Sequence, residues 1–265
     1  MKHPSGQCVF CGGGRLTKEH IWSDWIRDFV NTNSHVQTSQ SSLHNLAGRI
    51  ALTHENSETR MGAMHQRKVR IVCRRCNNGW MSACVAAAKP VAKQIISGGL
   101  INISPKEQES LATWIAIMHS MAEYIDTESL VVSASERSQI MATKLPPNSF
   151  VIHIGRYSGV GWRPMDYRHT ALTEAIPPPL PGPSALRLTD NKIGIATGVI
   201  GSLAFHVASS THAPFLSRFN NACLPSNMER IWPLRNRPID WGTVAVLSDL
   251  DLGGIHGRFA DLTRS

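Results

Sequence analysis

Two Cys-x-x-Cys pairs lie in the N-terminal third of the chain and are its clearest chemical signal. The four cysteines are Cys8, Cys11, Cys73 and Cys76. One tight turn with this spacing can direct two thiolates to a single ion, so two such turns predict a closed, tetrahedral zinc site. Iron bound as in rubredoxin is the alternative for the same four sulfurs.

A second set of chemical groups lies between and beside the cysteines. Glu19 and His20 are adjacent, and Asn77 directly follows the last cysteine. Carboxylate and amide oxygens are the ligands that Mg²⁺ prefers, and a histidine can act as a general base near neutral pH. A purely structural zinc site needs none of these groups. The pattern therefore predicts a second, catalytic ion near the first.

Composition describes a globular protein with basic character. The 265 residues are 42% hydrophobic and 17% charged, and 27 basic against 19 acidic residues give a formal net charge of +8. This balance favours polyanionic partners, with nucleic acid first and anionic lipid second. No run of eighteen apolar residues is present, so we expect no membrane-spanning segment and no membrane partner.

The segment before Cys8 is too short for the apolar core of a signal peptide. We therefore expect a cytoplasmic location, where paired cysteines hold metal more often than they form disulfides.

Periodicity predicts an α+β fold. In the N-terminal part we expect a strand over 16–21, a short helix capped by Ser23, a strand over 68–72 and a helix over 78–98. The segment from about 31 to 66 is rich in Ser, Thr, Asn and His, and we interpret it as a long, irregular polar insertion.

The rest of the chain changes from helix to strand. Ser104-Pro105 opens a second helix and a third covers 135–144. Later β-like runs cover 150–154, 168–176, 193–207, 229–234 and 243–247, and a proline-rich stretch over 177–183 predicts a stiff loop. We thus divide the chain into an N-terminal metal module (1–98), a helical bridge (99–147) and a C-terminal mixed α+β region with antiparallel strands (148–265).

The N-terminal motifs together resemble the zinc-containing HNH endonucleases. The resemblance lies in the first cysteine pair, in Leu16-Thr17-Lys18-Glu19-His20-Ile21, and in the run from Val72 to Trp80 (VCRRCNNGW). It covers about residues 7–98 and implies a ββα-metal fold, with the acid–histidine pair on the first strand and the second cysteine pair at the start of the helix.

The resemblance also implies roles for single residues. His20 matches the general base that activates water, and Glu19 matches the carboxylate ligand of a catalytic Mg²⁺, Mn²⁺ or other divalent ion. Asn77 matches the last motif position, which supplies a further ligand or positions that ion. The four cysteines match the ligands of a structural Zn²⁺.

The middle motif position, usually asparagine in this family, is Lys68 in this chain. Asn45, Asn56 or a backbone carbonyl are the candidates to orient the histidine instead. The densest basic run surrounds this position, and we expect it to contact phosphates of DNA. The residues of this run that we expect to bind nucleic acid are Arg67, Lys68, Arg70, Arg74 and Arg75.

These observations predict a metal-dependent endonuclease that hydrolyses DNA phosphodiester bonds, of a kind found in phage, restriction and defence systems. The alternative is a non-catalytic zinc-ribbon module that binds nucleic acid or protein. For the C-terminal region we expect substrate selection, binding of a protein partner or formation of a homodimer.

Overall fold

The computed structural model describes residues 6–29, 35–46, 49–61, 67–162, 165–176, 187–210, 216, 224 and 227–262. The stiff loop that we predicted over 177–183 lies outside these residues.

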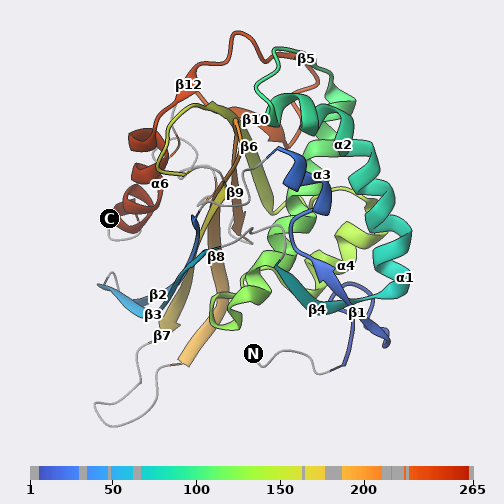
Figure 1. Cartoon of the computed structure of the whole chain (residues 1–265). Helices are drawn as coiled ribbons and strands as arrows, with labels where there is room; N and C mark the ends of the chain where they lie inside the picture. The colour runs from blue at the N-terminus through green and yellow to red at the C-terminus, as the bar shows by residue number, and fades with distance from the viewer. Residues whose placement is uncertain are drawn as a thin grey trace.

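A mixed eight-stranded sheet forms the centre of the molecule (Figure 1). Its strand order is β10-β6-β9-β8-β7-β2-β3, and β12 pairs with β6. Most neighbours are antiparallel, whereas β2 with β7 and β12 with β6 are parallel. The strands of the C-terminal region are β6 (Phe150–Tyr157), β7 (Met165–Ile176), β8 (Arg187–Ile200), β9 (Leu203–Ser210), β10 (Glu229–Trp232) and β12 (Val246–Leu247).

The polar insertion supplies the other two strands of this sheet. We predicted irregular structure over 31–66, and this was wrong for β2 (His35–Leu46) and β3 (Arg49–Met61). The polar side chains of β2 can be buried because they find partners elsewhere in the chain. Gln40 Nε2 donates to the Ala122 carbonyl at 3.0 Å, and Ser42 Oγ donates to the Glu128 carbonyl at 2.8 Å.

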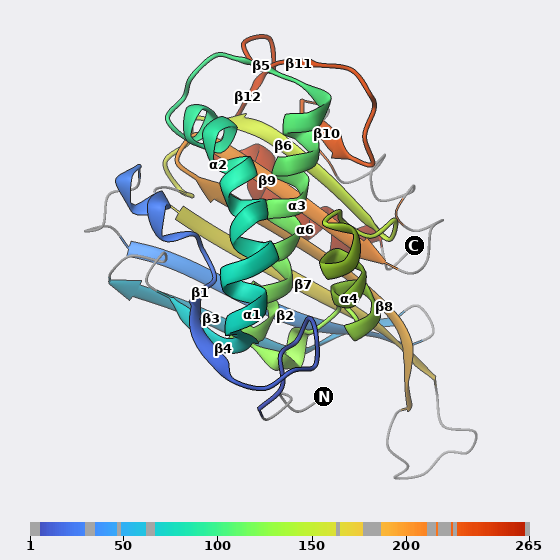
Figure 2. The same cartoon turned by 90° about the vertical axis from the view of Figure 1, so that its right-hand side faces the viewer.

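Helices cover both faces of the sheet (Figure 2). One face carries α2 (Ser82–Ile96), α3 (Pro105–Ala122) and α4 (Ala134–Thr143), and the other carries α6 (Asp249–Leu262). Alternate residues of a strand therefore enter different apolar clusters. In β9, Phe205 packs in the cluster that contains α3, whereas Ala204 packs with Phe259 of α6.

The helix α3 is the central element of the larger cluster. Ser104 and Glu107 form a capping box at its start, with Pro105 in the first turn, as the predicted second helix requires. Trp114 and Ile115 are fully buried. The predicted third helix is also confirmed as α4, which begins with a second capping box.

The predicted strands around the metal motifs are confirmed. β1 (Leu16–His20) pairs antiparallel with β4 (Lys68–Cys73), and these two form a small sheet of their own. The chain then continues into the short α1 (Arg74–Cys76), the π-helical segment η3 (Asn77–Met81) and α2. The helix expected after Ser23 is the 3₁₀ helix η1 (Asp24–Asp28), and the Ser23 side chain does not cap it.

Two features of the C-terminal region differ from the prediction. The run over 193–207 is a hairpin of β8 and β9 that turns at Gly201, where φ is +56°. A side chain at Gly201 would bring its Cβ to 2.6 Å from the Ile96 carbonyl oxygen, so glycine is required there. The helix α6 was not predicted. A further two-stranded sheet pairs β5 (Asn102–Ile103) with β11 (Ile239–Asp240).

The α+β class is thus confirmed, with both antiparallel and mixed sheets. The three parts that we distinguished share one apolar cluster, since Ile21, Trp114 and Phe205 all belong to it. Within the described part of the chain, none of the helices is both long and apolar enough to cross a membrane.

Candidate functional site

The first cysteine pair lies in a tight turn that is fastened to β4. The Cys8 N–H donates to the Gly13 carbonyl at 2.7 Å, and the Gly12 N–H donates to the Cys8 carbonyl at 2.8 Å. Gly12 adopts a φ of +71°, which glycine accepts without strain. The Val9 N–H donates to the Ile71 carbonyl of β4 at 2.9 Å, so this turn is held beside the strand that leads into the second pair.

The second cysteine pair brackets the first helical turn after β4. Cys73 is the last residue of β4, and Cys76 ends α1. The ligand atoms of all four cysteines lie within 4.8 Å of one another. The Sγ atoms of Cys11 and Cys73 are 3.5 Å apart, close to the separation of about 3.8 Å that two sulfurs have around a tetrahedral zinc ion.

The electrostatics of the four thiols also fit a cation. Burial raises the pKa of Cys11 and of Cys76. Burial acts on Cys73 in the same direction, but hydrogen bonds from the Cys76 backbone and from the neighbouring thiols outweigh it and lower the pKa of Cys73 to about 7. Burial thus opposes thiolate formation at Cys11 and Cys76, whereas a bound divalent ion would stabilise these thiolates. The four cysteines could bind a metal ion such as zinc.

Beside this cluster, Glu19 and Asn77 lie in direct contact. Glu19 precedes the last residue of β1, and Asn77 begins η3. The Asn77 Nδ2 donates a hydrogen bond to Glu19 Oε2. Burial raises the pKa of Glu19, although the Asn77 hydrogen bond, the His20 backbone and the charge of Lys68 oppose this effect. A half-buried carboxylate beside an amide is a donor set that suits a hard divalent cation.

Both β1, which carries Glu19, and η3, which carries Asn77, are locally irregular. The pairing of β1 with β4 shifts register between Thr17 and Glu19, and such bulges redirect the side chains that follow. In η3 the helix is wound as a π-helix, and Gly79 departs from helical angles with φ −98° and ψ −112°. Single π-turns of this kind are frequent at functional sites. Trp80 packs edge-on against Phe10 of the first cysteine turn at 5.2 Å between ring centroids.

His20 borders the same cavity as Glu19 and Asn77. The cavity holds about 210 Å³, and the polar side chains at its wall include those of Glu19, His20, Asp24 and Asn77. Its apolar wall comes largely from α3, with Trp114, Ile117, Met118 and Met121. The three residues that the motifs singled out therefore converge on one space.

Asp24 is a site residue that the sequence reasoning missed. Its Oδ1 lies 3.9 Å from His20 Nε2, four residues earlier in the chain, and its Oδ2 lies 3.3 Å from Arg27 Nη1. The signal was present as the i, i+4 spacing of an acid after the histidine. The η1 helix that carries Asp24 is anchored through Trp114 Nε1, which donates to Ser23 Oγ at 3.2 Å.

Lys68, at the middle motif position, lies directly opposite His20 in the β1–β4 ladder. Asn56, one of the candidates to take over the middle role, is exposed on β3. The other, Asn45, lies in β2, but its side chain is outside the described residues.

The basic residues lie along β4 and the turn after it. Lys68, Arg70, Arg74 and Arg75 are exposed, and Arg67 is half-buried. Lys68 and Arg70 are two residues apart on one strand and so share a face of it. The exposed cations thus follow the chain from the His20 end of the small sheet to the cysteine cluster.

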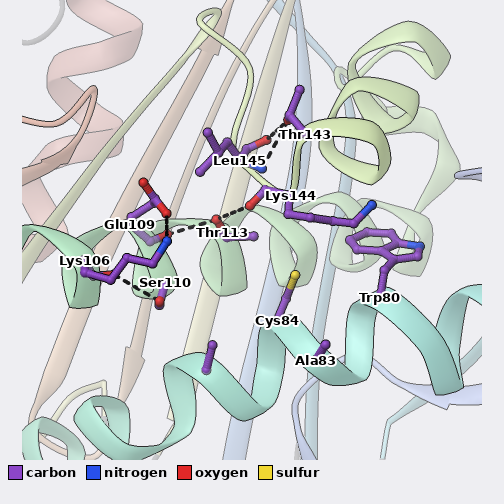
Figure 3. A pocket seen from close by; sticks show the side chains of 11 residues that line it. Trp80, Ala83, Cys84, Lys106, Glu109, Ser110, Thr113, Thr143, Lys144 and Leu145 are labelled. Carbon is purple, nitrogen blue, oxygen red and sulfur yellow. Dashed lines mark hydrogen bonds and ion pairs between the residues drawn. The ribbon is translucent and has the colours of Figure 1, made fainter.

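Trp80 lines a second hollow (Figure 3). It holds about 360 Å³ between α2, α3 and the end of α4. Figure 3 shows the Lys144 side chain beside the indole of Trp80, with its Nζ 5.2 Å from the ring centroid. The half-buried thiol of Cys84 lines it, and burial raises the pKa of this thiol. Glu19, His20 and Asn77 do not line this hollow.

Comparisons with known proteins identify no relative of this chain: no family model matches it, and neither does any curated protein or solved structure.

Proposed function

We propose that this chain is a metal-dependent endonuclease of the HNH kind and that residues 7–98 form its ββα-metal module. The observation that carries the proposal is the contact between Glu19 and Asn77 in a cavity that His20 also lines. The sequence motifs establish only the order of these residues along the chain. Their approach across 58 positions of chain, beside a four-cysteine cluster, is the arrangement that the proposed chemistry needs.

The chemistry is hydrolysis of a DNA phosphodiester. His20 takes a proton from a water molecule while the water oxygen bonds to phosphorus, and the bond from phosphorus to the 3′ oxygen breaks. Glu19 and the amide oxygen of Asn77, once the amide has turned, would hold a divalent cation. When bound, this cation stabilises the negative charge that develops on the departing oxygen.

Asp24 supports the role of His20. A carboxylate near one ring nitrogen favours the imidazolium that forms when the other nitrogen accepts a proton, and it also restrains the ring. The separation of 3.9 Å between Asp24 Oδ1 and His20 Nε2 suits such an ion pair. We propose that Asp24 carries out the orienting role that the middle motif position has in related enzymes.

The proposed substrate follows from charge. The exposed Lys68, Arg70, Arg74 and Arg75 lie on the element that leads from His20 to the cysteine cluster. Cations in this position can bind phosphates on either side of the scissile bond. The four cysteines would hold Zn²⁺ and keep the helix start that bears Asn77 next to β1.

A plasmid-nicking assay tests the proposal. Wild-type protein with Mg²⁺, Mn²⁺ or Ni²⁺ should nick supercoiled DNA, and His20→Ala should lower the rate by about a hundredfold or more. Cleavage at the wild-type rate in this variant would remove His20 from the mechanism. No cleavage with any metal, together with retained DNA binding, would favour a zinc-ribbon binding module, the reading consistent with Lys68 at the middle position.

A further inference from the structure

A cluster of three ionisable side chains lies in the core, outside the site described above. His119 belongs to the last turn of α3, Glu123 begins η4 (Glu123–Ile125), and His169 lies in β7. All three side chains are completely buried. Their ligand atoms lie within 4.8 Å of one another, and the two imidazole rings meet edge-on at 5.5 Å between centroids.

The separations in this cluster are too long for hydrogen bonds. Glu123 Oε1 lies 3.5 Å from His169 Nε2 and 3.8 Å from His119 Nε2, whereas hydrogen bonds between nitrogen and oxygen span about 2.7–3.2 Å. Among the described residues, neither Nε2 has a hydrogen-bond partner. Nitrogen and oxygen ligands at about 2.1 Å from a tetrahedral ion lie about 3.4 Å apart, close to the spacing found here.

In each histidine the second ring nitrogen, Nδ1, already makes a hydrogen bond. The Nδ1 of His119 is 3.0 Å from the Tyr167 hydroxyl, and the Nδ1 of His169 is 3.3 Å from Ser129 Oγ. If each Nδ1 carries the proton, each Nε2 presents its lone pair to the space beside Glu123. Hydrogen bonds to the second ring nitrogen orient metal-binding histidines in this way.

Glu123 is held by the backbone rather than by either histidine. Its Oε1 accepts hydrogen bonds from the Val131 and Val132 N–H groups at 3.1 and 3.3 Å, and its Oε2 accepts from Val132 at 3.1 Å. The carboxyl group is thereby fixed in place, at 3.5 and 3.8 Å from the two Nε2 atoms. A buried nitrogen without a hydrogen-bond partner is unfavourable, so two of them beside one carboxyl group need an explanation.

Burial disfavours the charged form of all three side chains. Burial lowers the pKa of His119 to about 3 and that of His169 well below its usual range, so both rings are neutral near pH 7. Burial also raises the pKa of Glu123 to about 8, against the opposing effect of the Val131 N–H and the Arg137 charge. Two neutral imidazoles and a carboxyl group are a donor set that suits a divalent transition-metal ion, which would displace the carboxyl proton on binding.

We infer that His119, Glu123 and His169 bind a divalent transition-metal ion, such as Zn²⁺, in the core between α3 and β7. Two imidazoles and one carboxylate are ligands that Zn²⁺ accepts, and the three leave one coordination position to a further ligand. Complete burial assigns the ion a structural role, in which it fastens the helical layer to the sheet.

The test counts and characterises bound metal in the intact chain. It uses a Glu19→Gln background, so that the proposed catalytic ion does not contribute. After reconstitution with Co²⁺ and gel filtration, we expect two ions per chain. One should show thiolate-to-cobalt charge-transfer absorption, and the other should lack it. His169→Gln should lose only the ion without thiolate absorption. Cys73→Ala should lose only the thiolate-bound ion.

The matched control is His256→Gln. This histidine is half-buried, and its two ring nitrogens contact the hydroxyls of Thr170 and Thr197, so both ions should stay bound. Because His169→Gln could impair folding, X-ray absorption at the zinc edge of the Zn²⁺-loaded Glu19→Gln protein provides a second measurement. A mixture of sulfur with nitrogen or oxygen neighbours is expected. One ion per chain with sulfur neighbours alone would overturn the inference.

Discussion

Asn77 donates a hydrogen bond to Glu19 although 58 positions of chain separate them, and the contact joins the start of a helix to the end of a strand. This relationship gives the pair its proposed role as ligands of one cation.

Replacing Asn77 should therefore affect cleavage far more than replacing its neighbour. We expect Asn77→Ala to lower the nicking rate by about 10–100-fold, the usual effect of losing a group that binds or orients a metal ligand. Added Mn²⁺ should restore part of the loss, because the remaining ligand still binds the ion.

Asn78→Ala is the matched control, since Asn78 is exposed and does not line the cavity of Glu19 and His20. It should cleave at the wild-type rate. Equal losses in both variants would show that the helix start matters only for folding.

Asp24 gives a second comparison within one short helix. Asp24→Asn should lower kcat about tenfold and leave DNA affinity unchanged, because the carboxylate no longer restrains and stabilises the His20 ring. Asp28→Asn, at an exposed position of the same helix, should leave both quantities unchanged. A loss of DNA affinity with unchanged kcat in Asp24→Asn would speak against an orienting role.

Loss of one cysteine ligand should release zinc and destabilise the chain. Structural zinc contributes on the order of 10 kcal/mol to small modules of this kind, so Cys73→Ala should lose one zinc ion and melt at a lower temperature. Cys84→Ala removes a half-buried thiol outside the two pairs and should keep its zinc. Zinc analysis and thermal unfolding measure both effects, and unchanged zinc in Cys73→Ala would refute the four-cysteine site.

Asp166 should make stability depend on pH. Burial raises the pKa of this carboxyl from 3.8 to about 6, although Arg168 and the Tyr167 backbone oppose the shift. The folded chain therefore holds a proton that the unfolded chain releases, and stability from this group is lost as the pH rises from 3.8 through about 6. Above about pH 6 the free energy of unfolding is lower by a constant amount, about 3 kcal/mol for a pKa shift of this size.

Asp166→Asn removes this dependence. Relative to wild type, its free energy of unfolding should rise across that pH range and then level off. Urea unfolding of both proteins from pH 4 to 8 measures the difference, with the exposed Asp28→Asn as control. A constant difference over the whole range would contradict the assignment to Asp166.

Local signals explain which elements the sequence could predict. The capping box of Ser104 and Glu107 and the spacing of the cysteines act within a few residues, so α3 and both cysteine turns were predictable. β4 followed from the alternation of apolar and polar residues over 68–72.

Elements that depend on distant partners could not be predicted. β2 is polar, and its Ser41 hydroxyl bonds to Thr170, which lies 129 positions away. The helix α6 contains Gly253, Gly254 and Gly257, which disfavour helix on their own, and it is stabilised by Phe259 and its neighbours against the sheet.

The same limit applies to the sites. Glu19, His20 and Asn77 carried recognisable spacing, whereas Asp24 gave only a weak i, i+4 signal. For the buried cluster, His119 and Glu123 are four residues apart, at the end of α3 and the start of η4, but His169 reaches them from a strand. Sequence separation hides such a group until the fold is known.

Anomalous diffraction from crystals soaked in Mn²⁺ would locate the proposed catalytic ion. We expect an anomalous peak in the cavity beside His20, at about 2.2 Å from a Glu19 oxygen and the Asn77 amide oxygen. Crystals of protein that nicks DNA with Mn²⁺ in solution, but that show no peak between these two side chains, would contradict this expectation.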